Sequence, residues 1–190
     1  MNPFEAGADA ANLSALAGQP FDLLIALENR LRVARLGAAG GETQSWTGLA
    51  FRLRQQWLVT PRDDVREVIT VPKVTRVPGA KPWMLGVANV RGSLLPVTDL
   101  GLLFGQESTP EQRDQRVLVF NSDRVPAGVL VDEVAGYRQF APSDQRHALA
   151  RDSGNLAPYL LGGFWREGRG WLVLSLHKLT RSLSFTVAGA

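Results

Sequence analysis

The chain has 190 residues, of which 45% are apolar and 21% are charged, and it contains 19 glycines and 11 prolines. These fractions are typical of a folded globular protein, and they exclude a disordered or collagen-like chain. The chain contains no cysteine, which excludes a disulfide framework, a thiolate metal site, an iron–sulfur cluster and a cysteine nucleophile. Its length allows one domain, or one domain with an appended segment.

From the sequence we expect neither a membrane span nor a secretory signal. No segment approaches the roughly 18 uninterrupted apolar residues that cross a bilayer. The first residues, Met1 to Glu5, do not form a basic patch followed by an apolar run. Together with the lack of cysteine, these features lead us to expect a cytoplasmic protein.

Positive charge is concentrated in the first half of the chain. The formal net charge is +3, and residues 30–91 hold 11 basic side chains but only four acidic ones. A basic segment of this kind indicates either the solvated face of a mixed-charge domain or a surface for nucleic acid, anionic lipid or an acidic protein. Both interpretations stay open at this point.

Residues 1–45 are expected to form an N-terminal extension. After a small, polar lead-in, apolar residues recur at three- and four-residue spacing: Phe21, Leu24, Leu27 and Leu31. This spacing predicts an amphipathic helix over about residues 21–36, and the glycine-rich stretch 37–41 predicts its end and a linker. The helix packs either on its own domain or against a partner protein.

From residue 46 onwards the pattern is that of short β-strands. About ten apolar or alternating runs are separated by Gly and Pro, and nine prolines between Pro61 and Pro158 exclude long helices. Ten strands exceed what one small barrel needs, so we predict a mainly β domain of two linked barrels over residues 46–182. Residues 183–190 are expected to be a C-terminal tail.

Three short helical turns and a set of core residues are also predicted. The turns span residues 99–104, residues 143–150 with Ser143 as N-cap, and residues 175–182 with Ser175 as N-cap. Residues inside apolar strand runs are expected to be buried: Phe51, Trp57, Val87, Val97, Val119, Val131 and Leu174.

Motifs of enzyme chemistry are missing from the sequence. The two histidines, His147 and His177, are 30 residues apart and lack metal-ligand spacing, and no phosphate-binding loop or nucleophile elbow occurs. The acidic pairs 63–64 and 132–133 are adjacent in sequence, and neighbours on a strand point to opposite faces. We therefore expect a protein that is not an enzyme and that holds no metal.

Five tryptophans in a basic β protein raise the alternative of a nucleic-acid-binding barrel, in which bases stack on exposed rings. Trp57 and Trp171 lie within apolar runs and are expected in the core. No single strand carries several aromatic residues with basic neighbours. The alternative therefore depends on composition and charge alone.

A long ordered motif lies between Val77 and Leu100. It consists of a Val-Pro pair, a Gly-Val-Ala-Asn-Val-Arg-Gly core at residues 86–92 and a Pro-Val-Thr-Asp-Leu ending at residues 96–100. This motif resembles the signature of CheW-like chemotaxis coupling domains. A Val-x-Glu-Val-Ile run at residues 65–69 and the runs at 116–119, 128–134 and 172–179 extend the resemblance over about residues 46–182.

Two features are similar to one branch of that family, the PilI-type couplers of type IV pilus chemosensory systems. One is the Lys-Pro-Trp sequence at residues 81–83 that precedes the motif core, and the other is the predicted N-terminal helix, rich in Leu and Arg. No ATP-binding or phosphotransfer segment of a histidine kinase is present. The resemblance therefore implies a stand-alone coupler.

The resemblance implies a fold of two SH3-like five-stranded barrels, in agreement with the strand count. It also implies a non-catalytic adaptor, without a cofactor, at membrane-associated receptor arrays in the cytoplasm. Its partners would be the regulatory domain of a CheA-type histidine kinase and the hairpin tip of a methyl-accepting chemoreceptor. Nucleic acid would not be a partner. The system would control type IV pilus twitching motility.

The resemblance also implies the partner-binding residues. The Asn-x-Arg-Gly turn of the family lies in the receptor-contacting region, which places Asn89, Arg91 and Gly92 there. The barrel that carries Val65 and Glu67 supplies kinase and receptor contacts. Trp83 packs either between the barrels or at the partner surface.

Arg91 and two aspartates each have a second, purely structural interpretation. Glycines on both sides of Arg91 favour a tight turn that leaves its guanidinium available to a carboxylate or amide, but Arg91 also suits a surface arginine with a local strand partner. Asp99 and Asp132 match the family pattern, but the structural interpretation, in which they cap turns or accept hydrogen bonds from backbone amides, is favoured for both.

Overall fold

The computed structural model describes residues 45–182, except for residues 109, 111, 123–125, 147–148 and 150–152. The chain separates into two compact units, Met1–Gln44 and Ser45–Ala190, and all described elements belong to the second. The predicted N-terminal helix and the tail 183–190 lie outside the described residues, as does His147.

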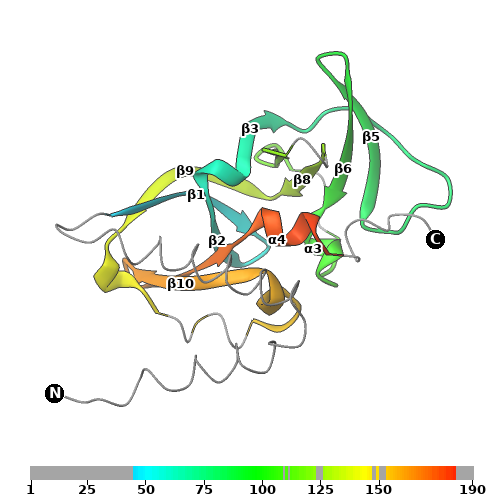
Figure 1. Cartoon of the computed structure of the whole chain (residues 1–190). Helices are drawn as coiled ribbons and strands as arrows, with labels where there is room; N and C mark the ends of the chain where they lie inside the picture. The colour runs from blue at the N-terminus through cyan, green and yellow to red at the C-terminus, as the bar shows by residue number, and fades with distance from the viewer. Residues whose placement is uncertain are drawn as a thin grey trace, which may run out of the picture. The chain divides into compact units, whose positions relative to one another are not determined.

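Five strands form a first sheet, named sheet A here. They are β1 (Trp46–Leu53), β2 (Gln56–Pro61), β9 (Glu133–Phe140), β10 (Leu160–Arg166) and β11 (Arg169–Leu174). Their spatial order is β10-β11-β2-β1-β9 (Figure 1). Neighbouring strands are antiparallel except for β11 and β2, which run parallel.

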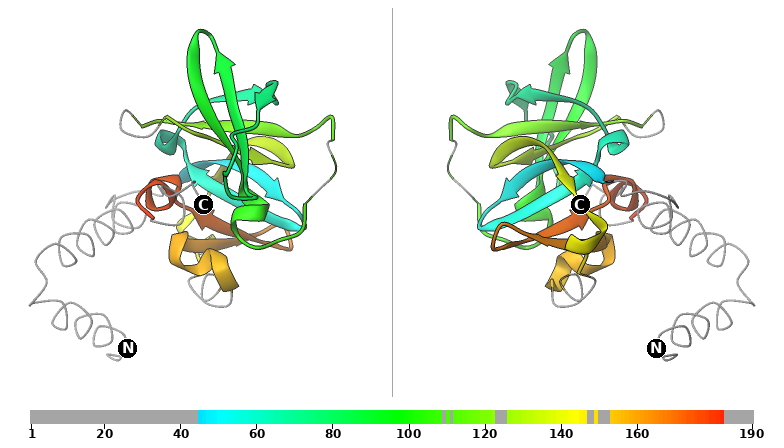
Figure 2. Two further views of the ribbon diagram at one scale, coloured as in Figure 1. Left: turned by 90° about the vertical axis from the view of Figure 1, so that its right-hand side faces the viewer. Right: turned by 90° about the vertical axis from the view of Figure 1, so that its left-hand side faces the viewer.

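Six strands form the second sheet, sheet B. They are β3 (Val65–Thr70), β4 (Val74–Thr75), β5 (Met84–Val90), β6 (Ser93–Asp99), β7 (Arg116–Phe120) and β8 (Gly128–Val131). Their order is β3-β7-β8-β6-β5-β4, and only β6 and β8 are parallel. The hairpin of β5 and β6 rises above the other strands in both views of Figure 2.

The two sheets are interleaved along the chain. Sheet A takes β1 and β2 from the beginning of the domain and β9, β10 and β11 from its end, whereas sheet B consists of the continuous stretch between them. In Figure 1 the cyan strands β1 and β2 therefore lie beside the yellow β9 and the orange β10. The sequence predicts two linked barrels but not this insertion of one sheet within the other.

Alternation of side chains along the strands decides which residues fill the core. In β1, Leu49, Phe51 and Leu53 are buried, and Arg52 between them is partly exposed. These three residues join a cluster that also contains Leu118 of β7. Sheet A and sheet B therefore share one main core, beside a smaller cluster within sheet B around Val97.

Five of the seven predicted core residues are buried: Phe51, Val97, Val119, Val131 and Leu174. The expectation is wrong for Val87 and Trp57, which are only half-buried. Val87 precedes the buried Ala88 on β5, so alternation turns its side chain outward. The ring of Trp57 packs 5.5 Å from that of Trp171, and the Arg169 guanidinium lies 5.6 Å from its centroid.

Two of the three predicted helical turns are confirmed with their caps. Asp99 caps α3 (Leu100–Leu103), where its side chain accepts a hydrogen bond from the Leu102 amide, and Ser175 caps α4 (Leu176–Thr180). Three 3-10 turns complete the described elements: η1 (Arg62–Asp64), η2 (Pro142–Asp144) and η4 (Gly154–Tyr159).

The prediction that Ser143 caps a helix over residues 143–150 is wrong. Ser143 lies inside the short turn η2, which begins at Pro142 and ends at Asp144. Pro142 occupies the first position of the turn, which proline favours. The Asp144 carboxylate accepts a hydrogen bond of 2.9 Å from the Ala141 amide. The N-cap of this turn is therefore Ala141, two residues earlier than the serine pattern predicts.

The mainly β, two-sheet architecture confirms the predicted fold class. Sheet B carries one strand more than the predicted five because the two-residue β4 pairs with β5. At Gly86 of β5, a Cβ atom would lie 2.3 Å from the Thr75 carbonyl oxygen of β4, so this close approach requires glycine. Within the described ranges, no helix has the length and apolar character needed to cross a bilayer.

Candidate partner-binding surface

The turn between β5 and β6 is a two-residue hairpin loop formed by Arg91 and Gly92. Val90 pairs with Ser93, and the loop residues have φ values of 50° and 84°. Positive φ at both central positions is typical of a type I′ turn, whose twist suits antiparallel strands. The Asn89 side-chain oxygen accepts a hydrogen bond of 2.9 Å from the Gly92 amide, which fixes the turn from within.

The Arg91 side chain forms an ion pair with Glu67 on β3. Its Nη2 lies 2.9 Å from Glu67 Oε2, and the two side chains are 78% and 26% exposed. β3 lies at one end of sheet B, and β5 lies next to its other end. The sheet therefore curls until its ends meet at this pair, and the guanidinium is held in place while most of its surface stays open to solvent.

Four of the six residues expected to contact partners come together at this hairpin: Asn89, Arg91, Gly92 and Glu67. Val65 does not join them, because its side chain is only 9% exposed and packs in the main core. The adjacent side chain on β3, Arg66, is exposed instead. Val65 therefore positions the strand, and its burial leaves little of its surface for a partner.

Trp83 lies at the opposite end of β5, just before Met84. It is half-buried, and its carbonyl oxygen accepts a hydrogen bond of 2.8 Å from the Asp99 amide. This bond ties the start of β5 to the end of β6. Trp83 is therefore separated from Arg91 by the length of the hairpin.

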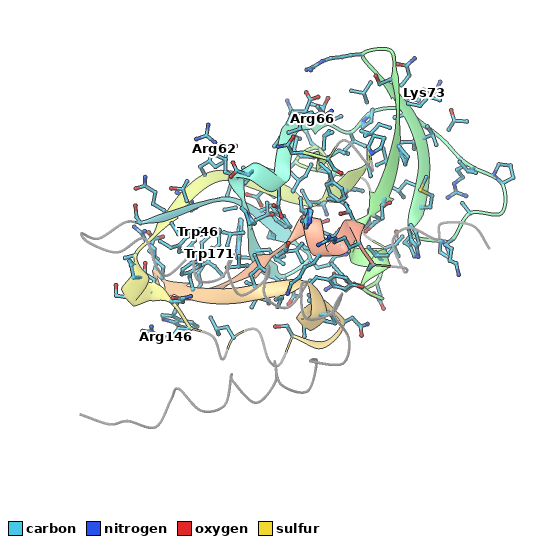
Figure 3. All side chains as sticks on the ribbon, viewed as in Figure 1. Trp46, Arg62, Arg66, Lys73, Arg146 and Trp171 are labelled. Carbon is cyan, nitrogen blue, oxygen red and sulfur yellow. The ribbon has the colours of Figure 1, made fainter. Side chains whose placement is uncertain are left out.

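A groove beside the hairpin adds residues that the sequence does not identify as surface. It is lined by Lys73, Thr75, Val87, Asn89 and Leu94, and Lys73 is labelled next to the hairpin in Figure 3. Leu94 is 71% exposed, whereas Leu95 is 5% exposed. Strict alternation within the Leu-Leu-Pro-Val run would have identified Leu94 as the outward residue.

Asp99 and Asp132 are structural residues at the boundary between the sheets. Both are buried and both face Arg54, whose guanidinium lies 3.1 Å from Asp99 Oδ1 and 2.9 Å from Asp132 Oδ1. The Arg54 amide also donates to Asp132. The two aspartates accept hydrogen bonds from backbone amides, as one interpretation of the sequence expected, but the shared arginine was not predicted.

Acidic and histidine side chains in the described ranges do not form a metal site. No group of three or more His, Cys, Asp or Glu residues there is close enough to hold an ion. Asp132 and Glu133 point to different arginines, since Glu133 pairs with Arg52 at 3.0 Å. Asp132 lies in the bend between β8 and β9, so the expected opposite orientation of neighbours on one strand does not apply to this pair.

The tryptophans do not form a stacking platform on one strand. Trp171 is buried, and the ring of Trp46 stacks on that of Phe164 with centroids 5.1 Å apart. Figure 3 places the labelled Trp46 and Trp171 close together within sheet A. Trp165 is 49% exposed but lies on another strand, so the nucleic-acid alternative gains no structural support.

Most of the described domain matches a known protein family. The model of the CheW-like domain matches residues 47–184. The chain belongs to the CheW-like family. The hairpin of Asn89 and Arg91 carries residues 86–92, the core of the motif that resembles the family signature.

Individual relatives of this CheW-like chain support the narrower resemblance as well. Protein PilI of Pseudomonas aeruginosa is 40% identical over 168 residues, which cover 87% of this chain and 94% of PilI. The chemotaxis protein CheW of Klebsiella aerogenes is 27% identical over 79% of this chain and 90% of its own length. The predicted PilI-type branch is therefore confirmed.

A solved structure supports the fold of the CheW-like domain. The scaffolding protein TtCheW from Thermoanaerobacter tengcongensis superposes with a TM-score of 0.65 and 20% sequence identity, covering 74% of this chain and 96% of that protein. At this identity the comparison supports the two-sheet architecture.

Proposed function

We propose that this CheW-like protein is a non-catalytic adaptor in a chemotaxis-type signalling array. It links the hairpin tip of a methyl-accepting chemoreceptor to the regulatory domain of a CheA-type histidine kinase, in the cytoplasm at the membrane-associated receptors. The output that we propose is control of type IV pilus twitching motility, and it rests on the 40% identity with PilI.

The observation that carries this proposal is the Arg91–Glu67 ion pair at the hairpin tip. A guanidinium that is 78% exposed and yet fixed by a carboxylate at 2.9 Å is preorganised for a second acceptor. The planar fork of arginine has five donors, so the contact with Glu67 leaves others available for an acidic or amide side chain. The exposed Leu94 beside it adds apolar surface.

Titration of receptor-tip fragments against wild type and Arg91→Glu tests the adaptor proposal. We expect Arg91→Glu to weaken receptor binding by about tenfold or more, because it removes a charge-assisted contact and leaves the receptor acceptor unpaired. Binding to the regulatory domain of the kinase should survive. Arg91→Lys should restore binding only in part, because an ammonium lacks the planar fork.

A charge-swap variant distinguishes recognition of the receptor by Arg91 from a purely structural role of its ion pair with Glu67. Arg91→Glu alone places two carboxylates side by side, at positions 67 and 91. The double variant Glu67→Arg/Arg91→Glu serves as control because it restores an ion pair in which the two charges have exchanged positions. If Arg91 contacts the receptor, the swap keeps the wild-type melting temperature but not the receptor affinity. If the double variant recovers full receptor affinity, the Arg91–Glu67 ion pair has only a structural role, and a direct contact between Arg91 and the receptor is refuted.

A further inference from the structure

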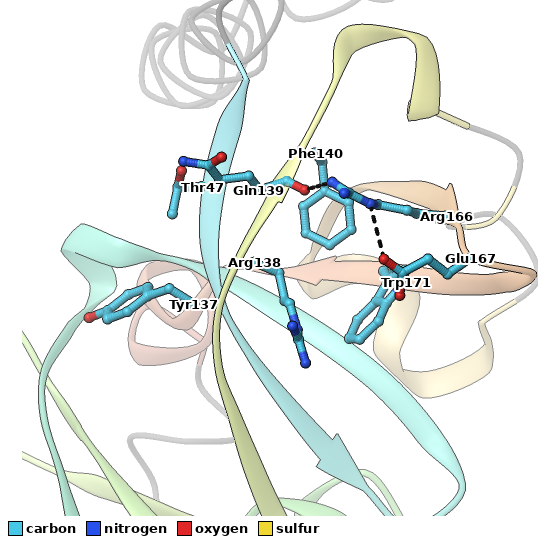
Figure 4. A pocket seen from close by; sticks show the side chains of 8 residues that line it. All are labelled: Thr47, Tyr137, Arg138, Gln139, Phe140, Arg166, Glu167 and Trp171. Carbon is cyan, nitrogen blue, oxygen red and sulfur yellow. Dashed lines mark hydrogen bonds and ion pairs between the residues drawn. The ribbon is translucent and has the colours of Figure 1, made fainter.

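A pocket opens in sheet A, away from the β5–β6 hairpin. Its volume is about 380 Å³, within the range of small-molecule sites. Residues of β1, β9 and the β10–β11 hairpin line it (Figure 4): Thr47, Tyr137, Arg138, Gln139, Phe140, Arg166, Glu167 and Trp171. The strands β9 and β10 are the two ends of sheet A, so the pocket lies where those ends approach each other.

The positive charge of Arg138 is not balanced by an acidic side chain in this pocket. Arg166 donates to the Gln139 carbonyl oxygen, and its Nε lies 3.5 Å from Glu167 Oε1, so these two opposite charges offset each other. Arg138 forms no ion pair with any residue in the described part of the chain. Its guanidinium is thus an uncompensated cation at the pocket wall; in Figure 4 no dashed line joins Arg138 to the other lining residues.

Two aromatic residues of the lining, Phe140 and Trp171, are almost completely buried beneath the pocket surface. Phe140 and Trp171 are 1% and 5% exposed, and their centroids lie 5.8 Å apart in an edge-on arrangement. The Trp171 Nε1 atom is buried and has no acceptor among the described residues. Buried donors are nearly always satisfied in folded proteins, and an unmade bond of this kind costs free energy.

We propose that this pocket binds a small planar anion, a flat ring that carries a carboxylate or a phosphate group. The oxyanion pairs with Arg138, and the ring lies over Trp171. Because Trp171 Nε1 is buried, a ligand oxygen reaches it only when the indole moves toward the pocket, and that oxygen then supplies the acceptor that the fold leaves out. The site is independent of the proposed adaptor surface, because the hairpin of Arg91 belongs to sheet B.

Binding of four probe molecules to the protein tests whether the ligand needs both a ring and an oxyanion. Benzoate and guanosine monophosphate carry a ring and an oxyanion, inorganic phosphate lacks the ring, and guanosine lacks the charge. Titration calorimetry of the full chain should give saturable binding of at least one ring-bearing anion, about tenfold tighter than that of phosphate or guanosine. Amide chemical shifts of residues 137–140 locate the bound probe, and the comparison of benzoate with the nucleotide distinguishes carboxylate from phosphate.

Variants then assign the contact residues. We expect Arg138→Ala to weaken binding by about tenfold, whereas Arg76→Ala, at an exposed arginine before β5, leaves it unchanged. Trp171→Phe keeps an aromatic ring but removes the indole N–H, and it should weaken binding further. Absence of saturable binding for both ring-bearing anions, or an equal loss in Arg138→Ala and Arg76→Ala, would overturn the proposal.

Discussion

Arg54 and Asp132 are joined by two contacts across the boundary between the sheets. The Arg54 backbone amide donates to Asp132 Oδ2, and Arg54 Nη1 lies 2.9 Å from Asp132 Oδ1. Arg54 belongs to the turn after β1 in sheet A, while Asp132 follows β8 of sheet B. A Cβ atom at Gly101 would lie 2.4 Å from the Arg54 guanidinium, so the glycine gives this arginine its space.

Removal of the Asp132 carboxylate should strongly destabilise the domain. Asp132→Ala removes the carboxylate that accepts hydrogen bonds from the Arg54 amide and guanidinium, while Asp99 still pairs with that guanidinium. Loss of hydrogen bonds to a buried charged group costs about 1.5–3 kcal/mol. The free energy of unfolding from urea titration measures this loss. Glu133→Ala is the matched control, because its pair with Arg52 is partly exposed and should contribute less than about 1 kcal/mol. Similar losses in both variants would contradict this view of the sheet boundary.

Phe51 and Trp57 should differ in their contributions to stability. Phe51 is fully buried, so Phe51→Ala is expected to cost about 3–5 kcal/mol. Trp57 is half-buried, and its truncation should cost clearly less than that range, since part of its surface stays in water. Urea denaturation of both variants provides the comparison, and an equal or larger cost for Trp57→Ala would show that its ring packing dominates over its exposure.

Deletion of residues 1–44 should leave the described domain folded. The second compact unit begins at Ser45, and the glycine-rich stretch 37–41 is expected to separate the predicted helix from the strands. We expect a cooperative melt close to that of the full chain. A large drop in melting temperature on deletion would show instead that the N-terminal segment packs into the domain core.

The stability of the domain should rise at alkaline pH through Lys178. Burial lowers the pKa of Lys178 below its ordinary value of 10.5, while its Nζ donates to the Leu160 carbonyl at 2.9 Å. Between the lowered pKa and 10.5 the unfolded chain binds more protons than the folded one, so the free energy of unfolding increases with pH in this window. Below the window, both states carry the charge and the folded state bears the desolvation cost.

Lys178→Met provides the comparison for this pH dependence. The difference in unfolding free energy between wild type and Lys178→Met should change in favour of wild type as the pH rises from the lowered pKa of Lys178 toward 10.5. Other titrating groups contribute equally to both proteins and cancel in this difference. A difference that stays constant with pH would contradict a lowered pKa at this lysine.

Local patterns allowed much of the fold to be predicted from the sequence. The turn at Arg91 and Gly92 and the caps Asp99 and Ser175 depend on a few neighbouring residues, and the structure has them where the pattern places them. Alternation in β1 likewise predicted the burial of Phe51. Such features are determined within a span of a few residues, which a single sequence contains.

Features that depend on distant partners were not predicted. Arg54 and Asp132 are 78 positions apart, and nothing near either residue indicates the other. Glu67 was selected by resemblance, but its contact with Arg91 depends on the curling of sheet B. Val65 and Leu94 lie in similar apolar runs and yet face opposite environments, because the pairing of whole strands decides which side is covered.

The interleaved order of the strands has a consequence for synthesis on the ribosome. Sheet B is complete once β8 has emerged, whereas β2 pairs with β11 through Leu58 and Leu172, close to the two ends of the domain. Pairing over such a sequence separation is slow, and an unpaired strand edge is prone to association with other chains. We therefore expect the inserted sheet to fold first during translation, and the arrival of the β10–β11 hairpin to close the exposed edge of β2 last.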